Sequence, residues 1–184
     1  MTRSKQLFFI ALLPPDEVQQ FVNQIKQHFA EIYDSRAAQK SPPHITLQPP
    51  FEWQLEELPA LEQKLQEFVQ TQSPIPITLD GFGAFRPRVI YINVLKTPEL
   101  LRRQKDLMTY LESSLSIVDP VSKNRPFAPH LTVAYRDLTK QNFRKAWSEF
   151  EQRKLHFEFT VLQLTLLNHN GRRWEIRKEF PFLS

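Results

Sequence analysis

Apolar residues recur along the chain with two periods, near 2 in some segments and near 3.6 in others, which predicts alternating strands and amphipathic helices. The first half predicts a buried strand at 7–13, a helix from 16 to about 33, and a strand at 44–47 that Pro49-Pro50 ends. A helix at 58–69 follows. A strand then begins at 75 and runs, within 75–85, into a turn that contains glycine. The second half predicts a strand at 89–94, a helix from 98 to about 115, a strand at 130–135, a helix around 143–150, and two closing strands at about 157–167 and 174–180. A hairpin turn at 168–171, with an Asn-Gly pair supplying positive φ angles, joins the closing strands.

The order strand, helix, strand, helix, strand therefore occurs twice, over about 7–85 and about 89–167. Only the tight turn at 86–88 separates the two copies, so we predict one domain, 1–184, with lobe one at about 7–85 and lobe two at about 89–180. The predicted fold class is α+β: duplicated βαβαβ lobes related by a pseudo-twofold axis, with helices outside and two antiparallel sheets lining a central groove.

Composition is that of an ordinary globular protein, with 184 residues, 41% hydrophobic and 24% charged. The formal net charge of +4 is mild and favours an anionic partner. The chain has no cysteine, which excludes disulfides, thiolate nucleophiles and cysteine-based metal centres. Its three glycines, Gly81, Gly83 and Gly171, build neither a Walker loop nor a dinucleotide-binding fingerprint.

The apolar run at 7–13 is short, is followed by Pro14-Pro15, and lacks a small-residue cleavage pattern. It is therefore better explained as a buried strand than as a secretory signal. No apolar run is long enough for a transmembrane helix. We expect a cytoplasmic protein with no membrane association and no obligate protein partner.

One short motif occurs at equivalent places in both copies. The segments Pro43-His44-Ile45-Thr46-Leu47 and Pro129-His130-Leu131-Thr132-Val133 both read Pro-His-aliphatic-Thr-aliphatic. Because alternate residues of a strand share a face, His and Thr lie on one face and the aliphatic residues on the other. The pseudo-twofold axis would place the two His/Thr faces opposite each other across the groove.

A single strand histidine is usually a structural or surface residue, but the repetition favours function. One neutral and one protonated histidine form a base and an acid on opposite sides of a reacting centre. Threonine hydroxyls can hold anionic oxygens between them, which points to a phosphodiester substrate. A zinc site is a weaker alternative, because no Asp or Glu lies beside either motif as a third ligand. We predict no metal and no other cofactor.

With these motifs the sequence resembles the 2H phosphoesterase superfamily, and most closely its bacterial 2′-5′ RNA ligase-like branch, also described as RNA 2′,3′-cyclic phosphodiesterases. The apolar first strand at 7–12, the Pro-Pro-His-Ile-Thr-Leu segment at 42–47 and the Phe-Ala-Pro-His-Leu-Thr-Val-Ala segment at 127–134 carry the resemblance. It implies metal-independent hydrolysis of a 2′,3′-cyclic phosphate, on RNA ends or small cyclic nucleotides, to a phosphomonoester. It further implies His44 as acid, His130 as base, and Thr46 and Thr132 as ligands of the non-bridging oxygens.

Five further residues are weaker candidates for substrate binding. Arg125 and Arg136 flank the second motif, and Arg86 and Arg88 lie at the junction of the lobes, where any of them could neutralise phosphate. Phe127, three residues before His130, could stack on a base. Each arginine has solvation, and Phe127 core packing, as its simpler explanation.

Other interpretations stay open at this point. The same site run in reverse would make a 2′-5′ RNA ligase, and a non-catalytic RNA-binding protein could keep this fold. A metal-dependent hydrolase is the last alternative. Direction of reaction, base preference, RNA length and oligomeric state are not determined by the sequence.

Overall fold

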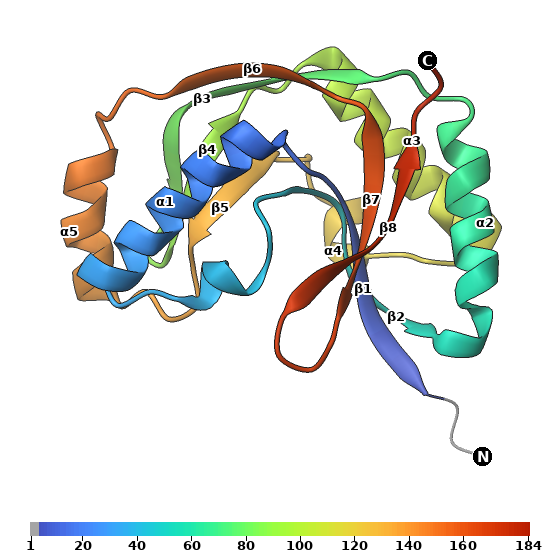
Figure 1. Cartoon of the computed structure of the whole chain (residues 1–184), viewed down its shortest axis with the longest axis horizontal. Coiled ribbons are helices and arrows are strands. Elements are labelled where there is room, and N and C mark those ends of the chain that lie inside the picture. The colour runs from blue at the N-terminus through green and yellow to red at the C-terminus, as the bar shows by residue number, and fades with distance from the viewer. Residues whose placement is uncertain (1–3) are drawn as a thin grey trace.

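The computed structural model describes residues 4–184 and follows the predicted element order (Figure 1). Its elements are β1 (Lys5–Leu12), α1 (Asp16–Ile32), β2 (Ile45–Gln54), α2 (Leu58–Val69), β3 (Ile75–Phe85), β4 (Val89–Val94), α3 (Pro98–Leu115), α4 (Pro120–Lys123), β5 (His130–Ala134), α5 (Lys140–Phe150), β6 (His156–Val161), β7 (Gln163–His169) and β8 (Trp174–Pro181). Short 3-10 helices cover Ala37–Lys40 and Leu55–Glu57. The predicted helices at 58–69 and from 98 to about 115 and the predicted strand at 89–94 are confirmed.

The strands form two antiparallel four-stranded sheets, with strand orders β2-β1-β7-β8 and β5-β4-β3-β6. Helices α1 and α5 lie against the second sheet, and α2 and α3 lie on the other side of the molecule with the first (Figure 1). Phe21 of α1 contacts Phe157 of β6, and Phe150 of α5 contacts Phe82 of β3. The α+β class and the pair of antiparallel sheets are confirmed.

The two sheets exchange strands between the two copies of the repeat. β1 and β2 come from the first copy, but they are joined by β7 and β8 from the end of the second. β4 and β5 come from the second copy, but they are joined by β3 from the first. The predicted lobes, 7–85 and 89–180, therefore do not each form a sheet of their own. A single large apolar core runs through both sheets.

The prediction that Pro49-Pro50 ends the second strand is wrong. β2 continues through both prolines to Gln54. It is an edge strand with β1 on one side only, and the prolines lie where its register shifts, between the Ile10–Gln48 pair and the Phe8–Phe51 pair. A proline at such a break on an edge strand costs few ladder hydrogen bonds.

The glycines at 81 and 83 do not form a turn, which corrects the prediction for this segment. β3 is continuous through both, with a bulge between Leu79 and Phe82 where its register against β4 shifts. Gly81 has a φ of 68° in this bulge, and its amide donates to the carbonyl of Leu155 at 2.9 Å. The turn to β4 is at 86–88, as the junction of the copies predicts.

The predicted strand at 157–167 is two strands. The chain changes sheets at Leu162, which is 63% exposed, so that β6 pairs with β3 and β7 pairs with β1. Apolar residues occupy the odd positions 157–161 and then the even positions 162–166, so the alternation changes phase at the break, which the prediction of one strand overlooked. In the following hairpin only Gly171 has a positive φ, of 95°. Asn170 instead accepts hydrogen bonds from the amides of Arg172 and Arg173 through its side chain.

Within residues 4–184, no helix combines the length and the apolar character that crossing a membrane requires.

Candidate active site

The two repeated motifs meet at one cavity of about 330 Å³, which His44, Thr46, His130 and Thr132 all line. Ile45, Leu47, Leu131 and Val133, which alternate with them, are almost completely buried in the core. The strand alternation therefore works as predicted, with the aliphatic face inward and the His/Thr face toward the cavity. None of the four longer helices contributes a lining residue, which agrees with helices on the outside of the groove.

Both histidines are held by the same local hydrogen bond. Nδ1 of His44 donates to the carbonyl oxygen of Pro42, and Nδ1 of His130 donates to that of Ala128, each over 2.7 Å. A carbonyl oxygen only accepts, so Nδ1 carries the proton in each neutral ring. The other ring nitrogen, Nε2, is then the one that can take a proton from a substrate or give one to it.

The electrostatic surroundings of the two rings differ. Burial lowers the pKa of His44 to about 4, against the hydrogen bond to Pro42, which raises it; the positive charges of Lys26 and His130 lower it further. Burial also lowers the pKa of His130, opposed by its hydrogen bond to Ala128. The effect is larger at His44, so in the unliganded protein the proton binds more readily to His130.

Lys26 is a charged residue that the sequence interpretation missed. Its side chain is 2% exposed, and its Nζ donates to the carbonyl oxygen of Ser41 at 2.9 Å. Burial lowers the pKa of this ammonium to about 7. The contact ties α1 to the Ser41-Pro42-Pro43 segment that carries His44, and Ser41 itself lines the cavity. The available signal was helical spacing, since Lys26 follows the buried Val22 by four residues on the apolar face.

The threonines present unused hydroxyl groups. Thr46 of β2 pairs with Ala11 of β1, and Thr132 of β5 pairs with Tyr91 of β4, so the two backbones are fixed within separate sheets. Neither hydroxyl is hydrogen-bonded to another residue in the part of the chain that the structure describes. Both are therefore available as donors to an anionic oxygen in the cavity.

Aromatic rings flank each histidine. The Phe9 ring lies 4.7 Å from that of His44, and Phe85 and Tyr91 lie 5.0 and 5.3 Å from that of His130. Gly83 makes room for Tyr91, because a Cβ added there would lie 2.5 Å from Tyr91 Cε2. These rings surround the histidines with apolar groups, in keeping with the burial that lowers both pKa values.

Arg136 lines the cavity as well, and its backbone is unusual. It has a φ of 60°, a left-handed conformation that costs energy for a side chain other than glycine. The next residue, Asp137, is anchored to the other copy of the repeat: its carboxylate accepts from the Ser35 hydroxyl and from the amides of Arg36 and Ala37 at 2.8–3.0 Å. Arg136 is thus held at the cavity by a contact between distant segments.

The other predicted binding residues divide into two groups. Arg125 and Phe127 line a smaller cavity of about 210 Å³ that adjoins the first and shares Thr46 and His130 with it. Arg86 and Arg88 lie in the exposed turn between β3 and β4 and line neither cavity. Their role in binding stays a prediction from the sequence.

Phe9 and Trp174 line the 330 Å³ cavity with the two histidines, and the sequence interpretation did not single them out. Their rings contact each other at 4.7 Å across β1 and the start of β8. Neither has a sequence signal, because they meet only through the pairing of β1, β7 and β8. Among residues 4–184, no group of three or more His, Cys, Asp or Glu side chains is arranged to hold a metal ion.

Comparison with known proteins gives a consistent result. Residues 14–173 match the model of the 2′-5′ RNA ligase superfamily. A protein from Geobacillus kaustophilus (strain HTA426) named "Putative phosphoesterase" is 33% identical over 175 residues, which cover 93% of each chain. A relative with the same name from Geobacillus thermodenitrificans (strain NG80-2) is 32% identical over 86% of this chain and 85% of its own.

Solved structures with the same fold include TT0787 of Thermus thermophilus, with a TM-score of 0.70, 21% identity and coverage of 96% of this chain and 97% of that one. LigT of E. coli in its apo form has a TM-score of 0.68 and 21% identity, over 98% of this chain and 99% of that one. LigT complexed with 3′-AMP has the same TM-score with 22% identity, over 98% and 100% of the two chains.

Proposed function

The chain belongs to the 2′-5′ RNA ligase superfamily of phosphoesterases, and from this premise we propose that it hydrolyses 2′,3′-cyclic phosphates, on RNA ends or small cyclic nucleotides, to phosphomonoesters without a metal. The observation that carries the proposal is the matched pair of histidines, each anchored through Nδ1 and each leaving Nε2 free at one cavity with two unbonded threonine hydroxyls. Two proton-transfer groups and two oxyanion donors are what this displacement requires.

The reaction needs one proton removed and one proton supplied. The base histidine takes a proton from water through Nε2 while the water oxygen attacks phosphorus. The bond from phosphorus to one ribose oxygen breaks in line, and the acid histidine donates the proton of its Nε2 to that oxygen. Thr46, Thr132 and the Arg136 guanidinium hold the non-bridging oxygens, whose negative charge they neutralise.

We assign the base role to His44 and the acid role to His130, the reverse of the roles that the resemblance implies. The pKa of about 4 keeps Nε2 of His44 unprotonated at neutral pH, where a base is needed. His130, with the smaller lowering of its pKa, is the ring that binds a proton more readily. A bound phosphate favours its protonated form further.

A nucleotide ligand is consistent with what related folds bind. LigT of E. coli has been solved in complex with 3′-AMP, a nucleoside phosphomonoester of the kind that opening a cyclic phosphate produces. The four cavity residues in this chain offer the groups for such a ligand: two ring nitrogens and two hydroxyls that line one cavity of about 330 Å³.

The test is hydrolysis of an oligonucleotide ending in a 2′,3′-cyclic phosphate, with and without EDTA. We expect turnover that EDTA leaves intact and that His44→Ala and His130→Ala each lower by about 10² or more. His156→Ala is the matched control, because this exposed histidine lies on β6 with Asp80 and Glu158. Full activity in either cavity variant would remove the two-histidine mechanism. Loss of turnover in EDTA would favour a metal-dependent hydrolase.

The same variants distinguish acid from base. A substrate in which sulfur replaces the leaving ribose oxygen needs little protonation, because a thiolate is a good leaving group. With that substrate we expect His130→Ala to regain most of its lost turnover and His44→Ala to stay inactive. The opposite pattern would restore the roles that the resemblance implies. Binding of the oligonucleotide without turnover of either substrate would favour the non-catalytic interpretation.

A further inference from the structure

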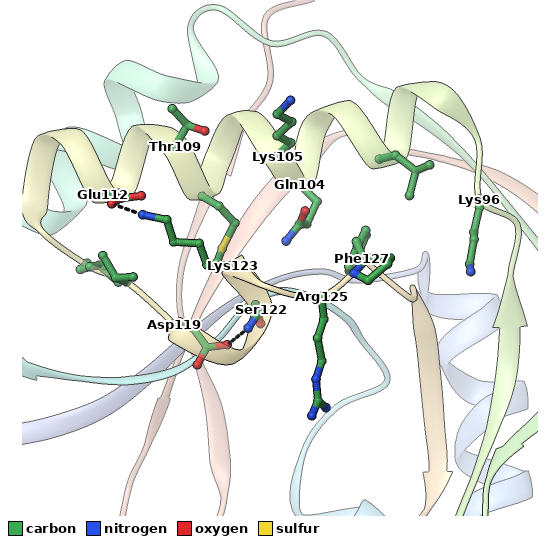
Figure 2. A pocket seen from close by; sticks show the side chains of 15 residues that line it. Lys96, Gln104, Lys105, Thr109, Glu112, Asp119, Ser122, Lys123, Arg125 and Phe127 are labelled. Atoms are coloured by element: carbon green, nitrogen blue, oxygen red, sulfur yellow. Dashed lines mark hydrogen bonds and ion pairs between the residues drawn. The ribbon is translucent and has the colours of Figure 1, made fainter.

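A second cavity, of about 570 Å³, lies between α3 and the segment that runs from α4 to β5 (Figure 2). The mechanism proposed above makes no use of it. Its walls come from the second copy of the repeat only, and Gln104, Ser122, Arg125, Pro126 and Phe127 are among its lining residues.

The cavity adjoins a smaller one that borders the proposed catalytic site. Gln104, Arg125 and Phe127 also line the 210 Å³ cavity described above, which reaches Thr46 and His130 at its other end. Three cavities thus share walls in sequence, from the catalytic site to the space below α3. A nucleic acid whose end lies between the two histidines would find this series of neighbouring cavities beside it.

Gln104 is a buried polar side chain without a partner. It is only 9% exposed, and its amide forms no hydrogen bond within the described residues. Figure 2 shows the side chain pointing from α3 into the cavity. The amide borders the cavity and has no protein partner there, so its donor and acceptor are available to a ligand. A carboxamide offers a donor and an acceptor side by side, as the edge of a nucleobase does.

The charges around the cavity favour an anionic ligand. Glu112 is paired with Lys123 at 2.6 Å, and the Asp119 carboxylate accepts from the Ser122 amide at 2.8 Å, so both acidic side chains are engaged (Figure 2). Lys96 and Arg125 extend to the same side of α3 as Gln104 and form no ion pair within the described residues. These two cations are available for phosphate.

The remaining wall is apolar. Phe127 is half-buried at the junction of the two cavities, and Leu101, Met108 and Ile117 also line the larger one. An aromatic ring beside an apolar floor can hold the flat face of a base, and such stacking tolerates every base. An acidic peptide would pair with the cations but would not require the apolar wall or the Gln104 amide.

We propose that this cavity binds the nucleotide that precedes the terminal cyclic phosphate, with its base against Phe127 and Gln104 and its phosphate near Arg125 and Lys96. This inference rests on the proposed function and narrows its substrate class. The preferred substrate is then an RNA end of two or more nucleotides, and a mononucleoside cyclic phosphate fills only part of the site.

The test compares a mononucleoside 2′,3′-cyclic phosphate with a dinucleotide that carries the same terminal nucleotide. In the wild type we expect kcat/KM to be at least about tenfold higher for the dinucleotide. Gln104→Leu keeps the size of the side chain and removes its amide, and we expect it to raise the KM for the dinucleotide about tenfold. The ratio of the two kcat/KM values should fall accordingly.

Two further variants serve as a second test of the cavity and as a matched control. Arg125→Ala changes an exposed side chain, so it gives the same readout without altering a buried helix position. Gln66→Leu removes the same amide from an exposed position of α2, away from all three cavities, and should leave the kcat/KM ratio unchanged.

The failures are separable. If the wild type opens both substrates equally well, and neither Gln104→Leu nor Arg125→Ala shifts the ratio, the inference is wrong and the proposed function stands. If the wild type opens no cyclic phosphate of either length, the proposed function fails and the inference fails with it. An equal loss for both substrates in Gln104→Leu would also contradict a separate subsite.

Discussion

The two histidines are local copies of each other, yet their surroundings make them unequal. The Nδ1–H of each ring donates to the carbonyl oxygen two residues earlier, because both halves repeat a Pro-His pair at the start of a strand. Only His44 has a buried ammonium group near it, that of Lys26. Burial is the largest cause of the lowered pKa of His44, and the Lys26 charge adds to it, so one duplicated motif can supply an acid and a base.

The lowered histidine pKa values predict an acidic pH optimum. A histidine whose pKa is lowered loses its proton at a lower pH than usual, so the acid form of His130 becomes scarce as the pH rises past 6.5. We expect kcat/KM to be maximal below about pH 6.5 and to fall steadily as the pH rises further. The profile of kcat should lie at higher pH, because the bound phosphate favours protonated histidine.

This prediction is checked with initial rates on a cyclic phosphate substrate, from about pH 4 to about pH 9, a range that brackets the ordinary histidine pKa. The phosphate charge of the cyclic substrate does not change in this range, so the rise and fall of the pH profile reflect ionisation of groups in the protein. A flat profile of kcat/KM on the alkaline side of the range would contradict the assignment of a protonated histidine as the acid.

At the scale of elements, α1 acts on the site from outside the groove. Its apolar face packs on the second sheet, and the hydrogen bond from Lys26 to the Ser41 carbonyl connects it directly to the segment before His44. The bulged β3 has a comparable role on the other side, where Gly83 allows Tyr91 to lie beside His130. Elements that carry none of the proposed catalytic groups thus determine where those groups lie.

The buried Lys26 predicts a specific dependence of stability on pH. Its pKa is about 7 in the folded protein and near the ordinary 10.5 when unfolded, so the unfolded chain binds the extra proton between these values. The free energy of unfolding should therefore rise from about pH 7.5 to about pH 9.5, with a slope of up to about 1.4 kcal/mol per pH unit from this group.

Urea unfolding at the two pH values measures the effect. Lys26→Met removes the titrating group and should flatten the dependence, and it should also lower kcat because the segment before His44 loses its anchor. Lys145→Met, at an exposed position of α5, is the control and should keep the wild-type slope. An unchanged slope in Lys26→Met would show that the ammonium group is not titrating in this range.

At the scale of the molecule, the exchange of strands makes the two halves interdependent. β3 pairs with β4 and β6, which both come from the second half of the chain, and β7 and β8 complete the sheet of the first half. Asp137 adds a polar contact across the same division. The proposed catalytic cavity is lined by residues of both sheets, so its geometry depends on both halves being folded together.

We therefore expect one cooperative unfolding transition. Trp147 on α5 reports on one side of the molecule, and Trp53 on β2 and Trp174 on β8 report on the other. A variant with only Trp147 and a variant with Trp147→Phe should each give the same urea midpoint by fluorescence as by circular dichroism. Midpoints that differ between fluorescence and circular dichroism within one variant would show lobes that unfold separately.

Local pattern was enough for much of this protein. The helices at 58–69 and 98–115 and the strand at 89–94 follow from periodicity, because burial of one face is recorded residue by residue in the sequence. His44, Thr46, His130 and Thr132 followed from a repeated motif on predicted strands. Alternation then determined which side of each strand faces the cavity.

Other features depend on contacts between residues that are far apart in the chain. The break at Leu162 sends β6 and β7 into different sheets, and only that pairing brings Trp174 beside Phe9 at the cavity. Lys26 reaches Ser41, and Gln104 faces a cavity closed by the segment from α4 to β5, without any sequence signal naming these neighbours. Residue types and their spacing thus specify the proposed reacting groups and the faces they occupy. Folding in three dimensions sets the charges, rings and spaces that surround those groups, since pKa values and substrate fit depend on distance in space and not on separation along the chain.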